Sequence, residues 1–321
     1  MDNQNLIEVE QLRKYYHIRD KLGRKTVLRA LDGVSFGIRR SETLGIVGES
    51  GSGKTTLGRT ILRLAEPDGG SIVYGGEDIT HAKMRPYRSK MQIIFQELYG
   101  CLDPRYRVKD IVAEGLRVHK PDYSAAQRMD RVQELLETVG LTKACAYRYP
   151  HEFSGGQQQR IGIARALAVE PEFIVCDEPV SALDVSYQSQ IINLLLEMRE
   201  KRELTYLFIS HDLAVVRHIC DRIGVMYLGK LVECGASNDI LINPAHPYTK
   251  ALLEAVPVPD PKASRAKARI LQDESADFGI PDKGCRYCNL CGYAEPRCFV
   301  EEPELKEVAP GHLCACHAVG F

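Results

Sequence analysis

The sequence predicts an α/β fold in which a mixed sheet is flanked by helices. Apolar runs of strand length alternate with stretches at helical spacing through the first two thirds of the chain. One run, residues 43–47, leads into a glycine-rich loop and then a helix-like segment. A later run, residues 173–178, ends in two adjacent carboxylates. These observations favour a core that binds a phosphorylated ligand at one edge of its sheet.

The glycine-rich loop fits the phosphate-loop pattern G-x-x-x-x-G-K-[ST], which predicts a P-loop NTPase core. Its glycines permit a tight turn whose N–H groups point inward, beside the positive N-terminus of the next helix. We expect Lys54 to reach the outer phosphates and Thr55 to place its hydroxyl on a magnesium ion. One such cation–phosphate contact at about 4 Å is worth roughly 4 kcal/mol at an effective dielectric of 20. The predicted nucleotide ligands are Gly48, Glu49, Ser50, Gly51, Ser52, Gly53, Lys54, Thr55 and Thr56.

Polar residues at strand ends extend this candidate site. Asp177 and Glu178 follow a buried apolar run, where one carboxylate can join a metal shell and the other can act as a base for water. Gln96 ends a short strand and could coordinate magnesium or orient water, although a solvated loop glutamine is the commoner fate. His211 also follows a strand, where a histidine can be structural or can contact a ligand. Tyr16 could stack on adenine or fill a core.

Two stretches at helical spacing follow the strand that ends at Gln96. Residues 129–139 carry apolar residues on one face, and Gly140 ends that pattern. A second helix is predicted to begin at Ser154, whose side chain would cap the N–H groups that follow it. The two glycines at 155–156 would weaken a first turn, and they suit a backbone that a ligand approaches closely.

Bulk composition is that of an ordinary globular protein. Of 321 residues, 44% are hydrophobic and 26% are charged, and 42 basic against 43 acidic residues leave a net charge of −1. The net charge therefore provides no overall electrostatic attraction to nucleic acid. No apolar stretch has the length of a membrane span, and the first residues lack the pattern of a signal peptide. We expect a cytoplasmic chain that is soluble by itself. Beyond residue 240 prolines become frequent, and the basic stretch 262–269 and acidic stretch 273–277 are predicted to form a solvated linker.

The motifs occur in an order that resembles the nucleotide-binding subunit of an ABC transporter. The order is GESGSGKTT, Gln96, FSGGQQQR, FIVCDEP, SALD and Ser210-His211-Asp212, over about residues 5–235. The resemblance implies that Tyr16 packs on the adenine of ATP, that Thr55, Gln96 and Asp177 serve Mg²⁺, that Glu178 is the general base and that His211 contacts the γ-phosphate. It also implies two subunits paired head to tail, so that one subunit's ATP is covered by the partner's Ser154, Gly155, Gly156 and Gln157. Phe153 replaces the more usual leucine.

Two further stretches are similar to the ATPases of oligopeptide, dipeptide and nickel importers: residues 96–105 and residues 243–253. The resemblance implies an ATPase domain at 5–240, with a helical signature subdomain at about 97–165, and a small irregular C-terminal extension at 241–321. It implies a site for the coupling helix of a permease near residues 96–105. The expected partners are a second ATPase subunit, identical or paralogous, two membrane permease subunits and an extracytoplasmic substrate-binding protein, with no nucleic acid. The chain would then lie peripherally on the cytoplasmic face of the membrane, and the solute would be a di- or oligopeptide.

Six of the eleven cysteines are concentrated in the extension, at Cys285, Cys288, Cys291, Cys298, Cys314 and Cys316. Free thiols, a zinc site completed by His312 or His317, and an iron–sulfur cluster are the three interpretations. The spacing in peptide-importer ATPases favours a [4Fe–4S] cluster, and this resemblance implies Cys285, Cys291, Cys298 and Cys316 as its ligands. Cys288 and Cys314 are additional here.

Two other function classes remain as alternatives. One is a soluble ABC-type iron–sulfur ATPase that acts on ribosomes or DNA, a class whose members usually carry two cassettes or a long coiled coil. The other is a regulatory binding module without turnover, which Glu178 and His211 argue against. The single cassette and the C-terminal segment favour the importer ATPase.

Overall fold

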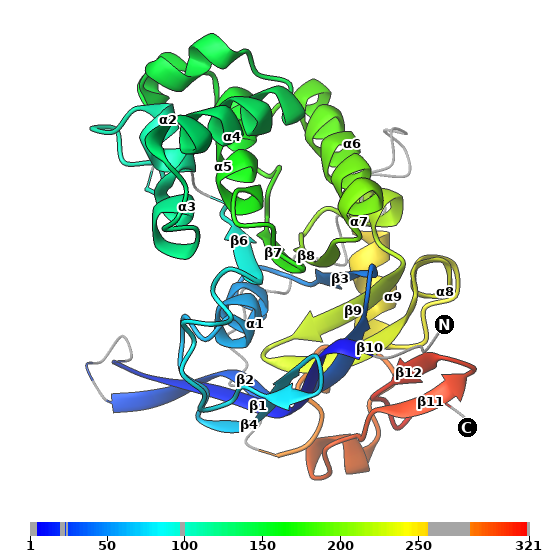
Figure 1. Ribbon diagram of the computed structural model, residues 1–321. Helices are drawn as coiled ribbons and strands as arrows, with labels where there is room; N and C mark the ends of the chain where they lie inside the picture. Colours follow the sequence, from blue (N-terminus) through cyan, green and yellow to red (C-terminus); the bar gives the residue numbers. More distant parts are fainter. Residues whose placement is uncertain (1–4, 20–22, 24, 97–99, 256–282, 320–321) are drawn as a thin grey trace.

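The computed structural model describes residues 5–19, 23, 25–96, 100–255 and 283–319 (Figure 1). In chain order the strands are β1 (Asn5–Arg19), β2 (Lys25–Arg39), β3 (Thr43–Val47), β4 (Gly69–Tyr74), β5 (Glu77–Asp78), β6 (Met91–Ile94), β7 (Phe173–Asp177), β8 (Thr205–Ile209), β9 (Arg222–Tyr227), β10 (Lys230–Ala236), β11 (Lys306–Ala309) and β12 (His312–Cys314). The α-helices are α1 (Lys54–Ile61), α2 (Val108–Val112), α3 (Glu114–His119), α4 (Ala125–Thr138), α5 (Gly155–Leu167), α6 (Val185–Arg202), α7 (Leu213–Ile219), α8 (Ser237–Ile242) and α9 (Pro247–Glu254). Short 3-10 helices are η1 (Lys143–Tyr147), η2 (Pro150–Glu152) and η3 (Pro296–Phe299).

A mixed eight-stranded sheet forms the centre, in the order β11-β12-β10-β9-β3-β8-β7-β6. The strands from β9 to β6 run parallel, whereas β10, β11 and β12 pair antiparallel. Because β3, β7 and β8 are parallel, their carboxyl ends meet at one edge of the sheet, and all three strands are buried throughout. The predicted mixed sheet flanked by helices is therefore confirmed, and its topology brings the strand-end residues to a common edge.

Two apolar cores lie on opposite sides of this sheet. One joins the sheet to the helices between α2 and α8, and the other joins it to α1 and to a second sheet of order β2-β1-β4-β5. Figure 1 shows the green helices α2–α5 gathered beyond β6 and β7, while α1 lies between the two sheets. The phosphate-loop helix is therefore held on its own side of the sheet, apart from the helix that begins after Ser154.

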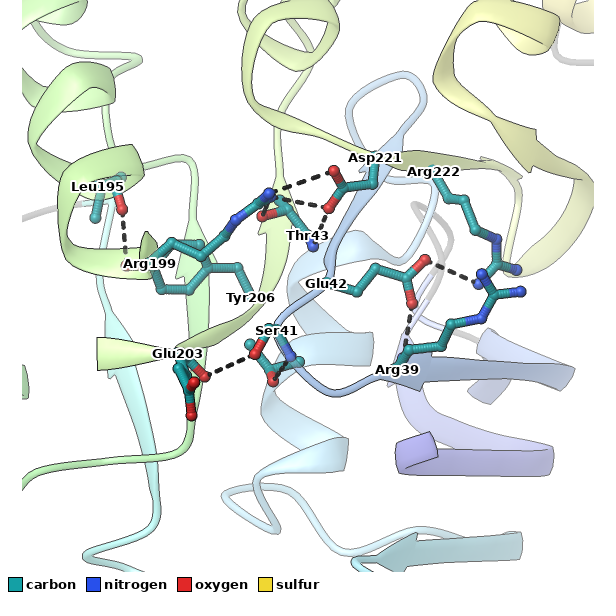
Figure 2. Close-up of polar contacts among 11 residues, drawn as sticks. Arg39, Ser41, Glu42, Thr43, Leu195, Arg199, Glu203, Tyr206, Asp221 and Arg222 are labelled. Carbon is teal, nitrogen blue, oxygen red and sulfur yellow. Dashed lines mark hydrogen bonds and ion pairs between the residues drawn. The ribbon is translucent and has the colours of Figure 1, made fainter. Parts of the chain in front are cut away.

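The end of the sheet opposite the phosphate loop is fixed by polar contacts (Figure 2). Asp221 accepts from the backbone N–H of Thr43 at 2.8 Å and from Arg199 at 2.8 Å. Arg222 pairs with the buried Glu42 at 3.2 Å, which ties β9 to the turn before β3. The Tyr206 hydroxyl donates to the carbonyl of Leu195 in α6 at 3.1 Å. These contacts hold the amino ends of β3, β8 and β9 together with α6. They thereby help to fix the carboxyl ends of the same strands, where the phosphate loop lies.

The N-terminal hairpin corrects one expectation. The apolar runs at residues 6–12 and 34–38 predict two short strands with a polar insertion between them. The structure instead has β1 and β2 of 15 residues each, which pair from Asn5↔Arg39 to Arg19↔Lys25. The far arms of the hairpin are exposed on both faces, so no alternation of apolar and polar residues marks them as strands. Ile18 and Val27, for example, are 41% and 48% exposed.

The C-terminal extension adds regular structure to the central sheet. Helices α8 and α9 follow β10, and β12 pairs with β10 through Glu233↔Cys314 and Cys234↔Leu313. The charged stretches at 262–269 and 273–277 lie outside the described residues. Within the part of the chain that is described, no helix has both the length and the apolar character needed to cross a membrane.

Candidate nucleotide site

A pocket of about 610 Å³ opens at the carboxyl ends of β3, β7 and β8. Eight of the predicted site residues line it: Tyr16, Ser50, Gly51, Gly53, Lys54, Thr55, Thr56 and Gln96, together with the two predicted catalytic residues, Glu178 and His211. The chain segments that carry these residues are separated by up to about two hundred positions. The fold therefore brings the separate motifs to one cavity.

The phosphate loop has the strained conformation that its glycines permit. Gly48, Gly51 and Gly53 have φ values of 148°, 79° and 104°, which side-chain-bearing residues rarely adopt. A Cβ at Gly48 would lie 2.2 Å from the carbonyl oxygen of Met226, and one at Gly53 would lie 2.2 Å from that of Ala30. Any other residue at these two positions would displace the loop from the neighbouring strands.

Lys54 is buried at the start of α1, where its Nζ donates to the carbonyl oxygens of Gly48 and Glu49 at 2.8 Å each. Burial lowers the pKa of Lys54, while the carboxylates of Glu178 and Asp177 act in the opposite direction. Its ammonium group is therefore poorly hydrated and lies at the floor of a cavity. Phosphate oxygens entering this cavity would restore the hydrogen bonds and charge that water supplies elsewhere.

Thr55 and Asp177 lie together as a magnesium site requires. The Thr55 hydroxyl donates to Asp177 Oδ1 at 2.9 Å, and Asp177 is only 3% exposed. Burial raises the pKa of Asp177, and the Thr55 hydrogen bond opposes this rise. A hydroxyl and a carboxylate at this separation, both oxygen donors, fit the ligand preference of Mg²⁺.

Glu178 is the centre of a second group of contacts. Its Oε2 accepts from Gln96 Nε2 at 2.9 Å and lies 3.1 Å from His211 Nδ1. Gln96 thus contacts Glu178, and its amide also reaches Ser181 Oγ at 3.5 Å. Glu178 itself has a φ of 46°, in the left-handed region that residues other than glycine seldom occupy. This conformation turns the chain sharply where β7 ends.

Some residues that line the pocket were not predicted from the sequence. Leu28, Arg29 and Ala30 of β2 line it beside Tyr16, which is 37% exposed, and Leu228 completes this wall. Pairing of Tyr16 with Leu28 across the hairpin places both strands there. Only the recognition of a long hairpin could have indicated these residues, because neither strand carries a local binding motif.

The segment Ser154–Gln157 lies elsewhere. Ser154 caps α5 as predicted: its Oγ accepts from Gln157 N at 3.4 Å, and Gln157 Oε1 accepts from Ser154 N at 3.1 Å. None of these residues lines the pocket of the phosphate loop. A Cβ at Gly156 would lie 2.8 Å from the Tyr187 ring, so packing within the chain already accounts for this glycine. Gly155 is exposed, and a Cβ there would make an ordinary van der Waals contact, 3.4 Å from the side chain of Leu183.

The cysteines of the extension line a separate, small cavity. Its walls include Cys285, Cys288, Cys291, Cys298 and Cys316, with His246, Tyr287 and His317 beside them. Cys314 is fully buried in β12 and does not line this cavity. Across the described ranges, no three His, Cys, Asp or Glu side chains are grouped closely enough to hold a single metal ion.

Comparison with known proteins places this chain in a family. Residues 31–181 match the family model described as "ABC transporter", and residues 232–298 match "Oligopeptide/dipeptide transporter, C-terminal region". The oligopeptide transport ATP-binding protein AppF of Bacillus subtilis is 49% identical over 98% of each chain. The chain belongs to the oligopeptide-type ABC transporter ATP-binding proteins. OppF of the same organism is 48% identical over 99% of this chain and 98% of its own length.

Solved structures of ABC cassettes share the fold of this family member. The protein cbiO1 of Clostridium perfringens, described as part of the ABC transporter complex cbiONQ, has a TM-score of 0.64 at 26% identity, and the match covers 74% of this chain and 91% of cbiO1. The dimeric cassette MJ0796 bound to ADP and phosphate has a TM-score of 0.65 at 28% identity, over 72% of this chain and 98% of its own. The chain is thus an ATPase subunit of the ABC type.

Proposed function

We propose that this ATPase subunit powers the import of di- or oligopeptides through membrane permease subunits. The observation that carries the proposal is the single cavity in which the phosphate loop, Gln96, Glu178 and His211 meet, in a chain whose extension matches the oligopeptide/dipeptide type. Its relatives are named as ATP-binding proteins of peptide transport or import, which supports the importer over an ATPase that acts on ribosomes or DNA. The net charge of −1 gives no support to a nucleic-acid partner.

In this proposal Glu178 is the general base for the attacking water. Its carboxylate is 15% exposed, so it is open to one water from the cavity, and Gln96 and His211 hold its Oε2 from two sides. Lys54 and the loop amides bind the phosphates, and Tyr16 packs on adenine at the mouth of the pocket. Thr55, Asp177 and Gln96 would hold Mg²⁺, which when bound neutralises charge on the phosphates.

The site is proposed to be completed by a second ATPase subunit, identical or paralogous. None of Ser154, Gly155, Gly156 and Gln157 lines its own chain's pocket, and the exposure of Ser154 and Gly155 suits approach to a partner's phosphate. The relative MJ0796 is described as a dimer. With the γ-phosphate present, both subunits gain contacts to it and the pair closes. Hydrolysis at Glu178 removes these contacts and lets the pair open.

Permease docking is proposed next to residues 96–105. Residues 97–99 of this stretch lie outside the described residues. In the segments that follow it, Tyr106, Val118 and Tyr147 are 55%, 59% and 50% exposed. Exposed apolar residues of this size mark an interaction surface when they are close together. The chain would thus lie peripherally on the cytoplasmic face of the membrane, with two permease subunits beneath it and an extracytoplasmic binding protein selecting the peptide.

The division into an ATPase domain at 5–240 and an extension at 241–321 belongs to the same proposal.

A [4Fe–4S] cluster is proposed for the cysteine cavity. Cys285, Cys291, Cys298 and Cys316 all line it, and each corner of such a cluster binds one thiolate, so the four sulfurs need not converge on one point. A single zinc ion requires its four ligands around one atom. The five cysteines around the cavity include the four thiolates that a cluster needs.

Anaerobically purified protein should contain iron and acid-labile sulfide at about four of each per chain. Serine at Cys285, Cys291, Cys298 or Cys316 should abolish both signals, because each variant removes one thiolate ligand. The matched control is Cys314→Ser, which changes a buried cysteine outside the cavity and should retain the cluster. Zinc without sulfide, or iron that survives all four ligand variants, would rule the cluster out.

The import proposal is tested by reconstitution. Vesicles that hold this chain with its permease subunits and partner ATPase should accumulate a labelled oligopeptide when ATP is supplied on the side of the ATPases. Accumulation should cease without ATP, because dimer closure depends on the γ-phosphate.

A further inference from the structure

The phosphate loop is contacted from outside the nucleotide pocket by the C-terminal extension. The backbone N–H of Glu49 donates to the hydroxyl oxygen of Tyr248, with 3.0 Å between nitrogen and oxygen. Tyr248 lies in α9, is 1% exposed and does not line the nucleotide pocket. The two residues are 199 positions apart. A residue of the extension thus binds the loop without being able to touch the nucleotide.

This contact holds one side of a peptide group that Lys54 holds from the other. Lys54 Nζ donates to the carbonyl oxygens of Gly48 and Glu49, while Tyr248 accepts from the Glu49 N–H. The same point of the loop is sterically constrained, since Gly48 packs against the backbone of Met226 and has a φ of 148°. The entrance of the loop is therefore oriented by hydrogen bonds on both faces, one of them supplied by the extension.

Tyr248 is itself fixed by the start of α9. His246 Nδ1 accepts from the Tyr248 N–H at 3.0 Å, and the Glu233 carboxylate accepts from the N–H groups of Ala245 and His246 at 2.6 and 3.0 Å. Burial lowers the pKa of His246 to about 4, so the ring is neutral at physiological pH and Nδ1 can accept. The backbone that leads into Tyr248 is therefore fixed by three hydrogen bonds, and this fixes the position of the Tyr248 hydroxyl beside the loop.

Tyr248 also packs against aromatic rings, one of which belongs to the cysteine segment. The Tyr248 ring centroid lies 4.5 Å from that of Tyr227 and 5.5 Å from that of Tyr287. Tyr287 lies between two of the cysteines in sequence and lines their cavity. A continuous set of contacts therefore runs from the cysteine cavity through Tyr287 and Tyr248 to the phosphate loop.

We propose that Tyr248 is a positioning residue for the phosphate loop, through which the C-terminal extension sets the affinity for ATP. Its hydroxyl fixes the Glu49 peptide group in the orientation that leaves the later loop amides free for phosphate. The inference rests on the nucleotide site described above and is independent of the transported solute and of the contents of the cysteine cavity.

The test is Tyr248→Phe, which removes the hydroxyl and keeps the packed ring. The dissociation constant for MgATP, measured by titration calorimetry, should rise about tenfold, or about 1.4 kcal/mol, because the Glu49 N–H loses its partner and the loop samples other conformations. The effect should fall on KM and leave kcat largely intact, since no group at the γ-phosphate is changed.

The matched control is Tyr206→Phe. Tyr206 is also fully buried, and its hydroxyl donates to Leu195 O at 3.1 Å at the opposite end of the sheet (Figure 2). Both variants should lose thermal stability, but only Tyr248→Phe should weaken ATP binding. Equal ATP affinity in Tyr248→Phe, Tyr206→Phe and the parent chain would overturn the positioning role while leaving the nucleotide site intact. If the parent chain failed to bind MgATP, the nucleotide site itself would be refuted.

Discussion

Replacing Glu178 with glutamine should leave ATP binding intact and lower turnover by about 10²- to 10⁴-fold, the usual contribution of a general base. The amide has nearly the same shape as the carboxylate, so it can keep contacts to Gln96 and His211, but it cannot accept a proton from water. With MgATP the variant should form a stable closed dimer, because the γ-phosphate is never removed. Phosphate release and sedimentation velocity measure the two effects.

Glu172→Gln makes the same chemical change outside the pocket. Glu172 lies just before β7, where it pairs with Arg40 at 3.1 Å and Lys90 at 3.9 Å on the surface. Exposed pairs of this kind contribute at most about 1 kcal/mol, so turnover should stay that of the parent chain. Parent-level turnover in Glu178→Gln would remove Glu178 from the mechanism.

Replacing Glu233 with alanine should lower the free energy of unfolding by about 3–5 kcal/mol, as expected when one partner of a buried charged network is removed. Glu233 is 0% exposed and binds the N–H groups of Ala245 and His246 and, at 2.7 Å, His312 Nε2. Alanine leaves the buried donors of His246 and His312 and the partly buried N–H of Ala245 unpaired, and opens a cavity between β10, α9 and β12. Urea unfolding measures the loss.

Glu307→Ala is the control within the same extension. Glu307 accepts a single N–H, from Gly311 at 2.6 Å, and lies exposed at the β11–β12 turn. Its removal should cost less than about 1 kcal/mol, because water replaces the carboxylate. Equal losses in the two variants would show that the buried network does not hold the extension to the sheet.

The sequence predicted those site residues that belong to a local sequence motif. Lys54, Asp177 and Glu178 follow apolar runs at strand ends, and parallel pairing of β3 and β7 around β8 then brings them together. Ser154 was placed at a helix start by its capping pattern, and the structure confirms the cap. Short-range rules were sufficient for these residues because one strand or one turn determines each position.

Long-range contacts could not be predicted in this way. The hydrogen bond from Glu49 to Tyr248, the pairing of the three-residue strand β12 with β10 and the burial of Glu233 each depend on how distant segments pack. Glu233 in particular occurs in a strand as one acidic residue among apolar neighbours, which would ordinarily be expected to face solvent. The extended hairpin of β1 and β2 was missed because its outer arms bury no face.

Peptide uptake by reconstituted vesicles tests the central claim most directly: that ATP hydrolysis by this chain drives import. Vesicles would carry the permease subunits and the partner ATPase together with the parent chain, Glu178→Gln or Glu172→Gln. They would enclose MgATP and receive a labelled tripeptide with the substrate-binding protein outside. The account predicts accumulation with the parent chain and with Glu172→Gln, and none with Glu178→Gln. Accumulation with Glu178→Gln at the parent rate, or hydrolysis by the parent chain without any uptake of peptide, would contradict it.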